Sequence, residues 1–172
     1  MKRWLLWLPL ILFLLVLGLV ALGLVKPANR TVRSQLLGKA MPAMTLPAIL
    51  LGHPGFHSSG GGPRLVNVFA SWCVPCAVEV GQLAELRKKG IAIDGIAVRD
   101  RPDDLARFLS RYGDPYRAIG SDSESRSMIA LGSSGVPESF IVDARGIIRY
   151  QHVGAIGPQD LGDVLRAYEA AQ

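Results

Sequence analysis

Two cysteines, Cys73 and Cys76, are the residues whose type and spacing most clearly indicate chemistry. They are the only cysteines in the chain, so no other thiol can form a structural disulfide with either of them. The apolar run at residues 65–70 predicts a buried strand that ends just before the pair, and a helical pattern follows. This junction places Cys73 at a helix N-terminus, where unpaired N–H groups and the helix dipole stabilise a thiolate. We therefore expect Cys73 to attack and the more enclosed Cys76 to resolve a mixed disulfide.

Two other interpretations of the pair compete with redox chemistry. A disulfide that only staples the fold would close a very short loop and remove little entropy from the unfolded chain. A zinc site requires about four ligands. The remaining soft ligands are the methionines, His53, His57 and His152, and none stands at metal-binding spacing. The sequence therefore favours thiol–disulfide exchange, and we expect no metal and no cofactor other than the Cys73–Cys76 disulfide itself.

The N-terminal residues are expected to form a transmembrane signal anchor at residues 1–25. The run from Trp4 to Val25 contains no charged residue and is 22 residues long. At about 1.5 Å per residue it would extend about 33 Å, enough to span the hydrocarbon core of a bilayer. A cleaved signal peptide is the alternative, with a small-x-small pattern at residues 21–23. We favour the anchor because signal-peptide apolar regions usually have only about 7–15 residues.

The charge distribution supports a membrane location and gives no reason to expect a nucleic-acid partner. The net charge of +5 comes entirely from five basic residues among the first 33, which contain no acid, while residues 34–172 carry 14 basic and 14 acidic side chains. Lys2 and Arg3 favour a cytoplasmic N-terminus. We therefore expect a single-pass protein of the inner (cytoplasmic) membrane whose C-terminal domain lies in the periplasm.

The rest of the chain predicts alternating strands and helices. Residues 26–45 are polar and contain prolines, so they are expected to be a linker, and residues 46–172 the folded domain. The Gly/Ser-rich residues 52–63 are expected to form a flexible surface loop. Strands are predicted at 65–70, 91–98, 116–119, 138–143 and 146–153, and helices at 74–89, 103–112, 123–131 and 158–171. This order indicates an α/β sandwich with a mixed central sheet.

Over residues 36–168 the chain resembles the thioredoxin-like CcmG/DsbE family of cytochrome c biogenesis thiol:disulfide interchange proteins. The segments that carry the resemblance are 38–42, 65–76, 112–116, 135–140 and 141–154. The resemblance implies a thioredoxin-like fold and a membrane-anchored reductase of oxidised apocytochrome c or its maturation partners. It also implies re-reduction by a membrane electron donor of the DsbD/CcdA kind.

The resemblance also assigns roles to residues around the cysteines. Pro137 would be a cis-proline facing the disulfide, and the backbone of Val136 would pair with an extended substrate. Trp72 is expected to be a contact residue at the border of the exchange surface.

Two acidic residues match acidic positions of the family. Glu79 lies one turn after Cys76 and could accept its proton or raise the pKa of the thiols, so Glu79→Gln should alter the pH dependence of exchange at Cys76. Glu138 follows Pro137 and is a second candidate catalytic residue. The alternatives are a solvated helix residue for Glu79 and a strand-edge charge for Glu138. Asn67 stands where ordinary thioredoxins place a buried acid.

Two other functions remain open on the same scaffold. The first is a general anchored thioredoxin of the TlpA/ResA type, because a Cys-x-x-Cys alone does not set the direction of electron flow. The second is a copper metallochaperone, which usually has one more residue between its cysteines and a well-placed downstream histidine. Here the spacing is two, and the only downstream histidine, His152, lies in the predicted closing strand.

Overall fold

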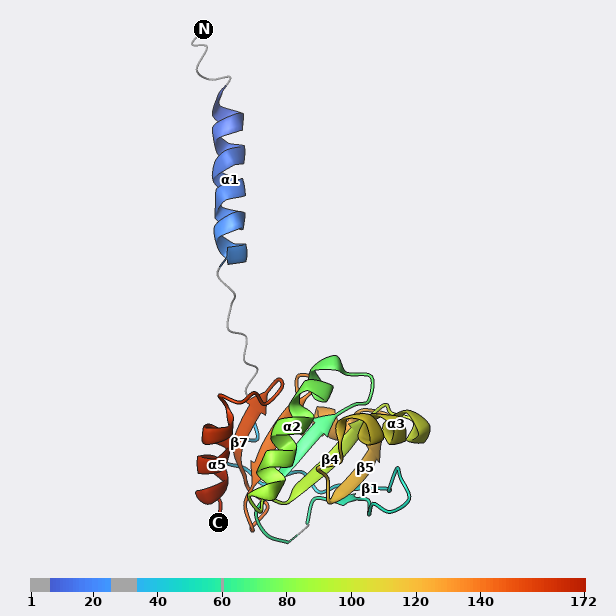
Figure 1. The fold of residues 1–172 in the computed structure, drawn as a ribbon. Coiled ribbons are helices and arrows are strands. Elements are labelled where there is room, and N and C mark those ends of the chain that lie inside the picture. The colour runs from blue at the N-terminus through green and yellow to red at the C-terminus, as the bar shows by residue number, and fades with distance from the viewer. Residues whose placement is uncertain (1–6, 26–33, 60) are drawn as a thin grey trace. The chain divides into compact units, whose positions relative to one another are not determined.

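The computed structural model describes residues 7–25, 34–59 and 61–172. The chain forms two compact units, Met1–Thr31 and Val32–Gln172. In the first unit, α1 (Leu8–Val25) is an 18-residue helix without a charged side chain (Figure 1). Residues 1–6 of the predicted anchor and residues 26–33 of the predicted linker lie outside the described residues. Among the residues that are described, the structure has no helix that is both long enough and apolar enough to cross a membrane.

The second unit is built on a five-stranded sheet. Its strands are β3 (Arg64–Phe69), β4 (Ile93–Val98), β5 (Ala118–Asp122), β6 (Glu138–Val142) and β7 (Ile148–Val153). They lie in the order β5-β4-β3-β6-β7, and the β3–β4 and β4–β5 pairs are parallel while β3–β6 and β6–β7 are antiparallel. The predicted mixed central sheet is therefore confirmed, and β3, which precedes the cysteines, is its middle strand.

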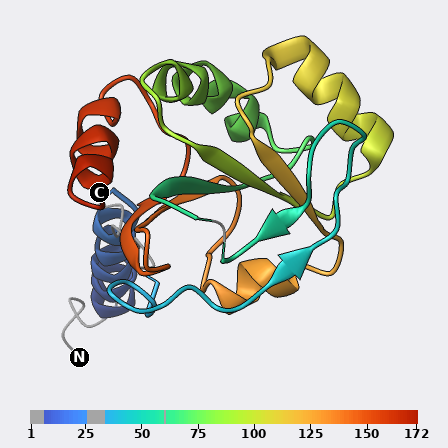
Figure 2. The same ribbon diagram turned by 90° about the horizontal axis from the view of Figure 1, so that it is seen from below.

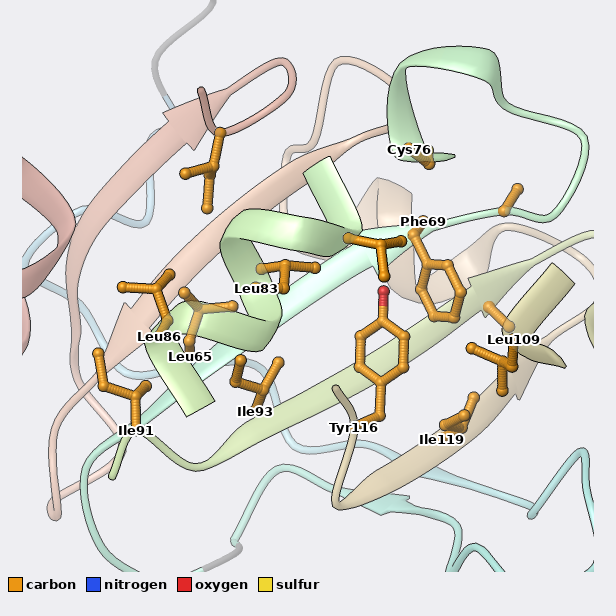
Figure 3. Close-up of a cluster of buried hydrophobic side chains, with 14 of the residues drawn as sticks. Leu65, Phe69, Cys76, Leu83, Leu86, Ile91, Ile93, Leu109, Tyr116 and Ile119 are labelled. Carbon is orange, nitrogen blue, oxygen red and sulfur yellow. The ribbon is translucent and has the colours of Figure 1, made fainter. Parts of the chain in front are cut away.

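Each face of the sheet is covered by its own set of elements (Figure 2). One face carries α2 (Val74–Lys88), α3 (Pro102–Tyr112) and α5 (Leu161–Glu169), and the other carries α4 (Arg126–Ala130), β1 (Thr45–Leu46) and β2 (Phe56–His57). Because successive strand residues point to opposite faces, Leu65 and Phe69 pack under α2 and α3, while Val66 and Val68 belong to the second core. Figure 3 shows the first of these two cores, which reaches Cys76 at its upper end.

The folded unit begins earlier than the predicted boundary at residue 46. The Ser34 hydroxyl donates to the carbonyl oxygen of Leu131 at 2.7 Å, although the sequence predicts that Ser34 belongs to the linker. Further along, the N–H of Gly38 donates to the carbonyl oxygen of Ile148 at 2.8 Å. Residues 38–41 lie along the start of β7, where their backbone groups find partners, and Met44 bonds to Ser58, so residues 34–45 are part of the folded domain.

The prediction of a flexible loop at residues 52–63 is wrong for its central part. Phe56 is fully buried in the second core, and β2 pairs antiparallel with β1. The hairpin lies so close to β5 that a side chain on Gly120 would bring its Cβ within 2.6 Å of the Cβ atoms of Leu46 and Phe56. The glycine and serine content of the segment predicts a loop, but Phe56 within it is part of the core.

Replacing Phe56 by Ala is expected to lower the free energy of unfolding by about 3–5 kcal/mol, because it leaves a cavity in the second core. His57→Ala is the matched control: His57 is the next residue of the same strand and is exposed, so its loss should change stability by about 0.5 kcal/mol or less. Urea unfolding of both variants makes the comparison. Equal stability of the two would contradict the assignment of Phe56 to the core.

Candidate active site

The two cysteines form a disulfide at the first turn of α2. Their Cα atoms are 5.3 Å apart and the S–S distance is 2.13 Å. Cys73 is the N-cap residue of the helix, and its Sγ accepts a hydrogen bond from the backbone N–H of Cys76 at 3.2 Å. Cys73 is 5 % exposed and Cys76 only 1 % exposed, so Cys76 is the more enclosed of the two. The predicted placement of the pair at a helix N-terminus is confirmed.

The turn between β3 and α2 is held by a carboxylate that lies just after the neighbouring strand β4. Asp100 accepts hydrogen bonds from the backbone N–H and the hydroxyl of Ser71, both at 2.6 Å. Ser71 and Asp100 each lie two residues beyond the end of a strand, and those strands, β3 and β4, are parallel neighbours. Sequence reasoning missed Asp100. The available signal was that parallel neighbouring strands end at the same edge of a sheet.

A proline loop borders the same surface. The Val136–Pro137 peptide bond is cis, as the resemblance implied. Val136 packs against the cluster that contains both cysteines. Together with Trp72, which is 60 % exposed, Val136 also lines a largely apolar groove of about 470 Å³. Within the described residues, neither the N–H nor the carbonyl of Val136 forms a hydrogen bond, so both are free to pair with an incoming chain.

Beneath the disulfide, Glu79 is fully buried, so its interpretation as a solvated helix residue is wrong. Its carboxylate accepts hydrogen bonds from Asn67 Nδ2 at 3.0 Å and from the N–H of Ile156 at 3.1 Å. Asn67 in turn donates to Ser139 Oγ at 3.0 Å and accepts from the Tyr116 hydroxyl at 2.8 Å. These four side chains and one backbone group form a connected hydrogen-bond network inside the first core.

Burial raises the pKa of Glu79 to about 7, although the hydrogen bonds from Ile156 and Asn67 act in the opposite direction. Burial also raises the pKa of Tyr116 well above its ordinary value, so the phenol stays protonated and acts as a donor. The Tyr116 ring lies against Phe69 with ring centroids 4.4 Å apart (Figure 3). Glu79 is one helical turn from Cys76, so an acid that exchanges its proton near neutral pH lies beside the resolving cysteine.

Glu138 lies in a different environment from Glu79. It is fully buried, which rules out a strand-edge charge in solvent, and its Oε2 accepts from Ser133 Oγ at 2.7 Å and the Ser134 N–H at 2.8 Å. Its register partner on β3 is Val68, which belongs to the second core, whereas the next residue, Ser139, bonds to Asn67. The structure therefore places Glu138 on the face of the sheet opposite Glu79, where it holds the loop before Pro137.

The described residues contain no group of three or more His, Cys, Asp or Glu side chains that could hold a metal ion. In the 52–63 segment, His53 Nε2 lies 2.8 Å from Asp114 Oδ2, whereas His57 is exposed.

A thioredoxin-like sheet with a redox-active disulfide at a helix N-terminus and an adjacent cis-proline defines a thiol:disulfide oxidoreductase. The comparisons with known proteins agree. Residues 36–167 match the family model described as Redoxin. The thiol:disulfide interchange protein DsbE of Pseudomonas fluorescens biotype C is 38 % identical, over 99 % of this chain and 96 % of its own length. The DsbE protein of Vibrio cholerae serotype O1 is 35 % identical, over 96 % of this chain and 93 % of its own.

Solved structures show the same fold. A thiol:disulfide interchange protein of the thioredoxin family from Chlorobium tepidum TLS superposes with a TM-score of 0.61 at 25 % identity, and the match covers 77 % of this chain and 94 % of that one. The chain therefore belongs to the DsbE (CcmG) family of thiol:disulfide interchange proteins.

The raised pKa of Glu79 predicts that stability depends on pH. Between the ordinary value of 4.5 and about 7, the folded state keeps a proton that the unfolded chain has lost. The free energy of unfolding of the oxidised protein should therefore fall as pH rises through this range, on the order of 1 kcal/mol per pH unit from this group. Glu79→Gln should remove that slope in urea unfolding measured at about pH 5, 6 and 7.

The matched control is Glu85→Gln on the exposed surface of the same helix. A hydrogen bond from Lys88 lowers the pKa of Glu85, so this carboxyl titrates below the tested range and the slope should persist. A Glu79→Gln protein with the wild-type slope would contradict the buried, titrating acid.

Proposed function

We propose that the chain reduces disulfides of exported proteins from the outer surface of the inner membrane, with oxidised apocytochrome c or its maturation partners as substrate. The observation that carries this proposal is the Cys73–Cys76 disulfide at the first turn of α2, beside the groove that Trp72 and Val136 line. The relatives named DsbE support the exchange chemistry. The cytochrome substrate rests on the resemblance of the sequence to the cytochrome c biogenesis family.

The reaction is a two-step thiol–disulfide exchange. In the reduced protein, the Cys73 thiolate attacks one sulfur of the partner disulfide, which forms a mixed disulfide and releases the other partner sulfur as a thiolate that takes up a proton. Cys76 then loses its proton and attacks Cys73 Sγ. The second partner sulfur leaves and is protonated. The partner gains two electrons, and Cys73 and Cys76 become the disulfide seen in the structure.

The first turn of α2 favours the first step. The Cys76 N–H that donates to Cys73 Sγ would donate to the same atom when it is a thiolate, and the positive end of the helix dipole acts in the same direction. The unpaired backbone of Val136 could then pair with the partner as an added strand, so that its disulfide lies in line with Cys73.

We assign proton transfer in the second step to Glu79. With a pKa of about 7, its carboxyl is partly ionised at neutral pH and can take the proton of Cys76.

If Glu79 takes this proton, the rate of Cys76 alkylation in a Cys73→Ser background, plotted against pH, should show a bend near pH 7. The bend should disappear in Cys73→Ser/Glu79→Gln and persist in Cys73→Ser/Glu85→Gln. Identical pH profiles for all three proteins would remove Glu79 from the mechanism.

Re-reduction requires a donor on the same side of the membrane. We propose a membrane electron donor of the DsbD/CcdA kind, because such a donor delivers two electrons by the same exchange chemistry in reverse. Anchoring through residues 4–25 would keep the domain near that donor. The uncharged run from Trp4 to Val25 in the sequence supports the anchor.

Trapping with Cys76→Ser tests the proposal as a whole. Without the resolving thiol, the mixed disulfide on Cys73 should accumulate, and carbonate-washed membranes should yield apocytochrome c or its maturation partners bound to the full chain. Non-reducing electrophoresis and mass spectrometry identify the adducts, and Cys73→Ser is the control that should form none.

Each other outcome of the trapping experiment has a defined meaning. Adducts with many unrelated exported proteins would favour the general TlpA/ResA-type reductase. Recovery of the chain in the carbonate supernatant would contradict the anchor, and an absence of adducts would contradict protein-disulfide exchange.

A further inference from the structure

A second groove borders Trp72 and is lined by arginines. This cavity of about 640 Å³, here called the arginine groove, is lined mainly by Trp72, Arg99, Arg101, Arg107, Arg111 and Tyr112. Trp72 and Arg99 also line the groove that contains Val136. The two grooves therefore adjoin at Trp72, which immediately precedes Cys73.

The positive charge of the arginine groove is only partly neutralised. Its two acids are Asp100, whose oxygens accept bonds from Ser71 and from the Arg101 N–H, and Asp104, which pairs with Arg107. In the part of the chain that the structure describes, Arg99, Arg101 and Arg111 have no carboxylate partner. Excess positive charge therefore remains on a solvent-exposed surface.

The backbone positions of these arginines are set by the fold. Arg99 has a left-handed backbone, with φ of 48°, and its N–H donates to the carbonyl oxygen of Asp122 at 3.1 Å. Arg107 and Arg111 are four residues apart on α3, so they lie on one face of that helix. The guanidinium of Arg111 lies 5.4 Å from the ring centroid of Tyr112. The arginines thus come from two elements that meet at the groove.

We propose that the arginine groove binds an acidic stretch of the partner polypeptide next to its reacting cysteine. This inference rests on the proposed function and specifies which partner sequences the site prefers. A chain joined to Cys73 Sγ lies close to Trp72, which lines the arginine groove, so its flanking residues are at high effective concentration near the groove. Arginine pairs with carboxylates through two parallel hydrogen bonds, and opposite charge also speeds encounter.

Disulfide peptides with different flanks test the arginine groove. Each peptide contains one disulfide, flanked by acidic, neutral or basic residues. The full chain, with its cysteines reduced and held in an uncharged detergent, is mixed with each peptide, and the rate of peptide reduction is measured. Each rate is divided by the rate at which dithiothreitol reduces the same peptide. At low salt, the acidic peptide should react about 10-fold faster than the neutral one, and most of this preference should disappear at high salt. Arg101→Glu/Arg111→Glu should abolish the preference without slowing reduction of the neutral peptide.

The matched control is Arg145→Glu/Arg166→Glu, which makes the same change in net charge at two exposed arginines that do not line the arginine groove. It should keep the preference. An acidic preference that survives Arg101→Glu/Arg111→Glu, or that falls equally in the control, would overturn the proposal.

Binding without chemistry separates this inference from the proposed function. Calorimetry with an acidic peptide that lacks cysteine should show binding to the full chain and none to Arg101→Glu/Arg111→Glu, whether or not any disulfide is reduced. If no peptide is reduced but this binding holds, only the proposed function fails. If the double variant loses binding to phosphatidylglycerol vesicles but keeps acidic peptides, the arginine groove is a lipid site and our proposal is wrong.

Discussion

One hydrogen bond, from the Cys76 N–H to Cys73 Sγ, connects the fold of this protein to its chemistry. It exists because Cys73 is the N-cap residue of α2, which follows β3, the middle strand of the sheet, after a short turn. Asp100 fixes the turn between them through Ser71. The sheet therefore positions a sulfur atom against unpaired N–H groups, which lowers the cost of carrying negative charge on that sulfur.

The second constraint is the burial of Glu79 below that turn. A carboxyl group in an apolar layer is unfavourable when charged unless it is hydrogen-bonded, and here Asn67 and the Ile156 N–H provide the bonds. The remaining desolvation raises the pKa of Glu79 to about 7, where proton exchange with a thiol is efficient. The charged form of Glu79 lowers stability at neutral pH. Under the proposed mechanism, this loss of stability accompanies a titrating group beside the resolving cysteine, as is common at functional sites.

The sequence predicted the parts of the molecule that have strong local patterns. The strand–Cys-x-x-Cys–helix junction and the mixed sheet follow from hydrophobic periodicity and from the helix-start position of Cys73. The resemblance to the family predicted the cis-proline loop at Pro137 and an acidic residue, Glu79, one turn after Cys76. Burial of Phe56 could not be predicted, because one aromatic residue among glycines and serines has no periodicity, and its core contacts are long-range.

The remaining differences are also tertiary. The Ser71–Asp100 contact joins residues 29 apart, and only the parallel pairing of β3 with β4 brings them together. Glu138 follows Pro137 in sequence, yet the alternation of β6 places it on the face opposite Glu79. Sequence proximity to the cysteine site is therefore a poor guide to contact with it when a strand intervenes.

The central claim is that this cysteine pair passes two electrons to a protein disulfide. Its most direct test is to mix the reduced full chain with an oxidised peptide bearing a Cys-x-x-Cys-His haem-attachment sequence and to count thiols on both by mass spectrometry after acid quenching. Our account predicts that each peptide disulfide reduced is matched by one Cys73–Cys76 disulfide formed. A peptide that stays oxidised while Cys73 and Cys76 stay reduced would contradict it.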